Sequence, residues 1–220
     1  MLPARIDGPC LIIGEGAHDE AFLRHLLQNR NISGYQVGFP QPPDQGSGGR
    51  GGFGEVLSGL RVRPDFMNIR AVVLVSDNDE DPVTSFNEIK AQIAEAGHLS
   101  VPTQPLNVAQ TTDHPDLVTV MLPWTDQIGC LETLCLPAAL DQWPMLRPCI
   151  EEYSRCANIK AWPKSKQSKM QLRCLFSAAC KTDPNTSLVY AWSRNPQLIS
   201  LEHHIFDQLA EFLRTFRTRY

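Results

Sequence analysis

Short apolar runs alternate with amphipathic segments over the first half of the chain, and this alternation restricts the fold more than any other feature. The apolar runs predict buried strands, because they are short and several are rich in β-branched residues. They lie at 10–13, 35–39, 69–75 and 117–122. Strands that alternate with helices pair in parallel through right-handed crossovers. We therefore expect an α/β fold with a small parallel sheet flanked by helices.

The segments between the predicted strands carry apolar residues at helical spacing. Within 17–30, Phe22, Leu23 and Leu26 recur every three or four residues, which predicts an amphipathic helix. Further helices are predicted at 55–62 and 83–97.

The character of the chain changes after residue 128. The predicted elements are then helices at 129–140, 144–158, 165–181 and 200–217. Ser200 is the expected N-cap of the last one. We divide the chain into an α/β domain, residues 1–128, and a helical extension, residues 129–220, packed on the same domain.

Composition excludes several classes of protein. A net charge of -4 over 220 residues gives no global basic field, so binding of nucleic acid would need a local basic patch or bridging metal ions. No apolar run approaches the roughly 20 residues that cross a membrane, and the first residues lack a signal peptide's apolar core. The seven cysteines form no CxxC pair, which is typical of reduced thiols. We expect a cytoplasmic protein.

Acidic residues follow two of the predicted strands. Glu15 follows the first, and Asp77 and Asp79 follow the third. Ligands bind at the carboxyl ends of parallel strands, and alternate side chains of an extended DxD point the same way. If the two strands are neighbours, the carboxylates converge and favour a hard divalent cation such as Mg²⁺, Mn²⁺ or Ca²⁺. The alternative is that the acids form a turn that caps the next helix.

Basic and glycine-rich segments give weaker indications. Lys164, Lys166 and Lys169 lie beside Trp162 and fit either a contact with a nucleic-acid backbone or the solvated start of a helix. The glycine-rich segment 40–54 formally matches GxGxxG twice, but it does not follow directly on a strand, so no dinucleotide site is expected. This segment is interpreted as a flap over the acids or as a plain loop.

Two stretches together resemble the TOPRIM domain. They are LIIGEGAHDEAFL and VVLVSDNDED, and the resemblance covers roughly residues 10 to 97. TOPRIM domains occur in topoisomerases, bacterial primases, RecR-type recombination proteins and nucleases of the overcoming-lysogenization-defect family. The resemblance implies that Glu15 is a metal ligand or general acid/base. It also implies that Asp77, Asp79 and Asp81 are metal ligands.

The nuclease branch of TOPRIM proteins adds a later glutamate and a lysine to the site. Glu132, within GCLE, resembles that glutamate, and Lys166 or Lys169 resembles the lysine. Lys164 and Lys169 are candidates for contact with the nucleic-acid backbone. The chain has no obvious space for a topoisomerase cleavage domain or for primase modules, so it is most similar to small stand-alone TOPRIM proteins of unsettled role.

Two functions are compatible with these residues. The first is a nuclease or related phosphoryl-transfer protein that uses Mg²⁺ or Mn²⁺ and acts on nucleic acid, with Glu15 and Lys166 as catalytic residues and Ca²⁺ as a non-catalytic substitute. The second is a non-catalytic module that binds nucleic acid, a nucleotide or a protein partner. A partner such as an ATPase and an oligomeric state are both left open.

Overall fold

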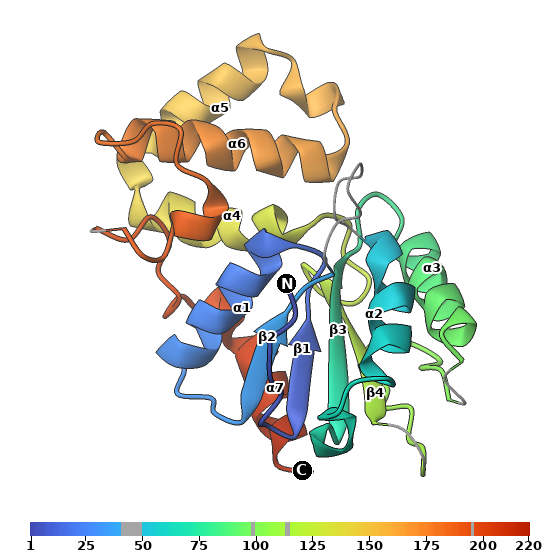
Figure 1. The fold of residues 1–220 in the computed structure, drawn as a ribbon. Coiled ribbons are helices and arrows are strands. Elements are labelled where there is room, and N and C mark those ends of the chain that lie inside the picture. The colour runs from blue at the N-terminus through green and yellow to red at the C-terminus, as the bar shows by residue number, and fades with distance from the viewer. Residues whose placement is uncertain (41–49, 98–99, 113–114, 195) are drawn as a thin grey trace.

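A four-stranded parallel sheet forms the centre of the protein (Figure 1). The computed structural model describes residues 1–40, 50–97, 100–112, 115–194 and 196–220. The strands are β1 (Cys10–Ile13), β2 (Tyr35–Gly38), β3 (Ala71–Asp77) and β4 (Asp116–Leu122). Their order is β2-β1-β3-β4, and every neighbouring pair is parallel. The predicted α/β class with a small parallel sheet is confirmed.

Helices cover both faces of the sheet, because successive side chains of each strand point to opposite faces. One face packs on α2 (Phe53–Leu60) and α3 (Pro82–Glu95). The other packs on α1 (Ala17–Asn29), α4 (Leu131–Gln142) and α7 (Asp207–Arg217). Strand β3 shows the division: Val72 and Leu74 face the first group of helices, and Val73 faces the second.

The C-terminal half is mostly helical and places two helices beyond the sheet. These are α5 (Arg147–Cys156) and α6 (Lys164–Ala179), and α6 packs on α4. Figure 1 shows both above the carboxyl ends of the strands. A side-chain hydrogen bond joins α6 to α4, since the Thr133 hydroxyl on α4 donates to Ser168 Oγ on α6 at 3.0 Å. One side of α6 therefore faces the carboxyl ends of the strands.

The last predicted helix begins later than expected. It starts at Asp207, after a single 3₁₀ turn at His204–Phe206, and not at Ser200. The side chain of Arg30 donates to the carbonyl oxygens of Leu201 and His203 at 2.9 and 3.1 Å. These carbonyls point to a distant side chain instead of following the pattern of helical hydrogen bonds. This long-range contact accounts for the shorter helix.

Two of the predictions from composition concern the state of the cysteines and the presence of membrane-spanning segments. All seven cysteines are free thiols. No helix in the described ranges combines the length and the apolar character that crossing a lipid bilayer requires.

Candidate functional site

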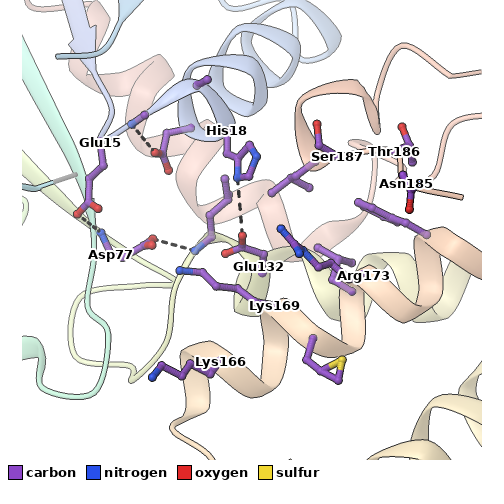
Figure 2. A pocket seen from close by; sticks show the side chains of 18 of the residues that line it. Glu15, His18, Asp77, Glu132, Lys166, Lys169, Arg173, Asn185, Thr186 and Ser187 are labelled. Atoms are coloured by element: carbon purple, nitrogen blue, oxygen red, sulfur yellow. Dashed lines mark hydrogen bonds and ion pairs between the residues drawn. The ribbon is translucent and has the colours of Figure 1, made fainter. Parts of the chain in front are cut away.

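Glu15 reaches from the end of β1 to the end of β3. The two strands pair in register, with Ile13 opposite Leu74, so the residues that follow them are close. Oε1 of Glu15 accepts hydrogen bonds from the backbone N–H of Asp77, at 3.1 Å, and from the Ser76 hydroxyl. Figure 2 shows the resulting pair of carboxylates. The structure therefore places these two acids next to each other at the carboxyl ends of β1 and β3.

The first turn of α4 adds a third carboxylate. Asp77 Oδ1 accepts from the backbone N–H of Leu131 at 2.8 Å, at the positive end of the α4 dipole. The next residue, Glu132, lines the same cleft, and its Oε1 lies 3.9 Å from His18 Nδ1 (Figure 2). Burial lowers the pKa of His18 although Glu132 opposes the shift. The structure therefore brings Glu132 beside Asp77.

Asp19 is a fourth acid of this group, and the sequence did not single it out as a ligand. Only 7% of its surface is exposed, and its Oδ2 accepts from the Gly16 N–H at 2.9 Å. Burial raises its pKa to about 7, and the charge of Glu15 adds to the shift. The pKa of Asp77 is also raised well above its usual value, by burial and by Asp19, Glu15 and Glu132. These carboxylates are held together against their mutual repulsion.

Cys130 lies next to the acids but has the wrong chemistry for a hard cation. Ligand atoms of Asp77, Cys130 and Glu132 all lie within 4.8 Å of one another. Burial, followed by the charge of Asp77, raises the pKa of the thiol, so it stays protonated, and its Sγ donates to the Ser165 carbonyl at 3.7 Å. The remaining donors are carboxylate oxygens, which suit Mg²⁺ or Mn²⁺.

Asp79 does not share the orientation of Asp77. Strand β3 ends at Asp77, and Asp79 has a left-handed backbone with φ of 51°. Its N–H and carbonyl exchange hydrogen bonds with Gly129, both at 2.7 Å. The expectation that Asp77 and Asp79 face one site as an extended DxD is therefore wrong. Asn78 does turn aside, as expected, and its amide donates to three carbonyl oxygens of the 124–127 segment.

Arg50 separates Asp79 from the other acids. Its Nη2 lies 2.7 Å from the Asp77 carbonyl oxygen and 2.8 Å from Asp79 Oδ2. Nε is 3.5 Å from Glu15 Oε1, and Nη1 is 2.7 Å from Glu88 Oε2. This arginine, isolated among glycines in the sequence, supplies a positive charge at the edge of the acidic group. Residues 41–49 of the predicted flap lie outside the described residues.

Asp81 and Lys164 lie apart from the convergent acids. Asp81 is the N-cap of α3 and accepts from Val83 N and Thr84 N at 3.0 and 3.1 Å. This is the capping role considered as the alternative in the sequence. Lys164 begins α6 and donates its backbone N–H to Glu80 at 2.9 Å. Neither side chain lines the cleft that contains Glu15.

A cleft of about 1170 Å³ joins the acids to one face of α6. Lys166, Lys169 and Arg173 line it from that helix, spaced three and four residues apart, and Figure 2 shows the Lys169 ammonium directed toward Asp77. Burial would lower the pKa of Lys169, but Glu132 leads a group of neighbours that raise it above its usual value. The ammonium is therefore charged at neutral pH.

The opposite end of the cleft is lined by uncharged residues, some polar and some apolar. Asn185, Thr186 and Ser187 line this end (Figure 2), together with the side chains of Phe176 and Leu188. The cleft as a whole therefore combines an acidic end, a basic wall and a neutral end. The acidic end is formed by Glu15, Asp19, Asp77 and Glu132.

Comparison with known proteins identifies a family but no characterised relative. No curated protein and no solved structure matches the chain. The family model described as "Protein of unknown function (DUF3226)" matches residues 9–218. That match covers the sheet, the acidic group and the helical half together. The chain belongs to the DUF3226 family.

Proposed function

We propose that this protein is a divalent-metal-dependent phosphodiesterase that cleaves nucleic acid, with a TOPRIM-like acidic site at the carboxyl ends of β1 and β3. The observation that carries the proposal is the convergence of Glu15, Asp77 and Glu132 in one cleft beside Lys169. Glu15 lies in the turn after β1, Asp77 at the end of β3, Glu132 in α4 and Lys169 in α6. The order and type of the acids along the chain fit the TOPRIM resemblance.

The electrostatics of the acidic group favour a bound cation. The pKa of Asp77 and that of Asp19 are raised by burial and by the neighbouring acids, so without a cation part of the group is protonated at neutral pH. Oxygen donors of this type match Mg²⁺ and Mn²⁺. Such an ion would polarise a phosphate oxygen and lower the pKa of a water molecule.

Glu15 and Lys169 would have separate roles in the reaction. Ser76 and the Asp77 N–H hold Oε1 of Glu15, so Oε2 would be the oxygen that binds a cation or accepts a proton from the attacking water. Lys169, whose charge is held by the acids around it, would offset the charge that develops on the phosphate oxygens. This position favours Lys169 over Lys166 as the lysine of the acidic end, while Lys166 stays on the basic wall.

The test is hydrolysis of labelled DNA and RNA with Mg²⁺, with Mn²⁺ and with EDTA. Wild type should cleave only with metal, and Glu15→Gln, Asp77→Asn or Glu132→Gln should each reduce the rate by about 100-fold or more, as for loss of one transition-state contact. Glu151→Gln, on the exposed surface of α5, is the matched control and should retain the full rate. Cleavage that survives EDTA, or that ignores Glu132→Gln, would contradict the proposal.

One observation favours the alternative of a non-catalytic module that binds nucleic acid, a nucleotide or a protein partner. Arg50 already neutralises part of the acidic edge through Glu15, Asp79 and Glu88. Less negative charge is then left to attract a second metal ion, which two-metal cleavage of a phosphodiester would use. This alternative predicts heat of Mn²⁺ binding in calorimetry without turnover of any phosphodiester. The same titration on Asp77→Asn should then give no heat.

A further inference from the structure

The basic wall on α6 consists of Lys166, Lys169 and Arg173, and none of these cations forms an ion pair with a described residue, although Lys169 is surrounded by the acids of the site. Most arginines along the chain form ion pairs, such as Arg63 with Asp65 and Arg155 with Glu152. Within the described ranges, neither Lys166 nor Arg173 lies within ion-pair distance of a carboxylate. Both side chains are exposed to the cleft. Unpaired cations that line a cleft are suited to an anionic ligand.

The spacing of these cations matches more than one phosphate. At a rise of about 1.5 Å per residue, Lys166 and Arg173 lie about 10 Å apart along the helix axis. A nucleic-acid strand advances about 3.4 Å per phosphate when stacked, so this length spans about three phosphates. A ligand with a single phosphate at the acidic end would leave Arg173 without a partner.

Other residues that line the cleft supply contacts of a different kind. Trp162 lines the cleft with 44% of its surface exposed, and an exposed aromatic ring beside cations is typical of surfaces that stack the bases of single strands. At the far end, Asn185 and Ser187, which carry an amide and a hydroxyl, line the cleft (Figure 2). These groups donate hydrogen bonds without adding negative charge.

We propose that the cleft binds a single-stranded nucleic acid, with Lys166 and Arg173 on phosphates about three apart along the strand and Trp162 stacked on a base. The choice of a strand over a duplex follows from size, because a pocket of about 1170 Å³ is only slightly larger than pockets that enclose one small ligand. The inference rests on the proposed function for the identity of the phosphate held at the acidic end. The contacts of Arg173 and Trp162 do not depend on cleavage.

Binding of a fluorescein-labelled hexathymidylate, followed by anisotropy in Ca²⁺ and in EDTA, tests the inference. Arg173→Gln should weaken binding about tenfold and lower the slope of log affinity against log salt by about 0.7, the value for one single-strand phosphate. Trp162→Ala should also weaken it about tenfold, and Trp162→Phe should restore most of the affinity because a stacking ring remains. Arg155→Gln on α5 removes the same charge away from the cleft and should change neither quantity.

Two outcomes would overturn the inference. One is equal affinity for hexathymidylate in Arg173→Gln, Trp162→Ala and wild type, and the other is equal affinity of wild type for the strand and for a duplex of the same length. Failure of the proposed function has a different signature. It would appear as no Mn²⁺-dependent hydrolysis of bis(p-nitrophenyl) phosphate, a small diester with no base to stack and only one phosphate.

Discussion

Asp19→Asn should make the protein more stable at alkaline pH, although it removes a buried hydrogen-bonding acid. The side chain is nearly isosteric, and its amide oxygen can accept the Gly16 N–H that Asp19 Oδ2 accepts now. The amide cannot acquire the negative charge that burial and Glu15 disfavour in the wild type. The substitution therefore removes an electrostatic penalty while it keeps the start of α1 intact.

The size of this penalty follows from the pKa. Burial raises the pKa of Asp19 from an ordinary value of 3.8 to about 7, a difference that corresponds to about 4 kcal/mol at 1.36 kcal/mol per unit. Because the folded-state pKa is the higher one, the stability is fully present below pH 3.8 and is lost as pH rises through about 7. We expect Asp19→Asn to gain about 2 to 4 kcal/mol over wild type between pH 4.5 and 8.5.

Thermal unfolding in EDTA measures this difference. For a chain of this length, about 2 to 4 °C in Tm corresponds to 1 kcal/mol, so the Tm of the variant should exceed that of wild type by about 5 to 15 °C at pH 8.5. The two proteins should converge near pH 4.5, where Asp19 is protonated. Comparison with the variant cancels the titration of carboxylates far from Asp19, whereas the pKa of Asp77, which the charge of Asp19 helps to raise, should fall in the variant. Parallel Tm curves over this pH range would refute the reasoning.

Three further predictions concern the surroundings of the acidic group. Arg50→Gln leaves its carboxylate partners without a counter-charge and should tighten Mn²⁺ binding about tenfold in calorimetry, whereas unchanged binding would place Arg50 outside the electrostatics of the site. Gly129→Ala should lower the free energy of unfolding in urea by about 2 to 4 kcal/mol, because φ is 136° and a Cβ would lie 2.5 Å from Thr133 Oγ1. Its control, Gly59→Ala in α2, meets no atom within 4 Å and should stabilise by about 0.5 to 1 kcal/mol. Glu80→Ala removes the cap of α6 and should cost about 1 kcal/mol in the same urea assay; no loss would mean that the cap is dispensable.

The sheet was predictable because its signal is local. Strand β3 is an apolar, β-branched run that fits a doubly covered strand, and its parallel direction follows from the helical connections α1 and α2 that separate the first three strands. The start of α7 was not predictable from local pattern. Ser200 and the apolar residues after it resemble a capped helix, but Arg30, far away in the chain, binds the carbonyls of 201 and 203.

The site was predictable to the extent that it depends on strand ends. Glu15 lies two residues after β1 and Asp77 is the last residue of β3, so the neighbouring strands bring them together. Asp79 is two residues further, where the left-handed backbone and the pairing with Gly129 redirect the chain. Asp19 had a signal that was not used. It lies one helical turn before Phe22 on the buried face of α1, an unusual place for an acid without a special role.

The charges of the cleft also determine an order of binding. A phosphate that approaches the acidic end alone would meet Glu15, Asp77 and Glu132, and Lys169 offsets only part of this negative charge. The unpaired cations on α6 attract the rest of a strand but lie along the wall, not between the acids. A divalent ion at the acids would reverse the sign of that end and allow the reacting phosphate to enter it. The strand would therefore dock first on the wall in the absence of metal, and would reach the acidic end only after a cation is bound there.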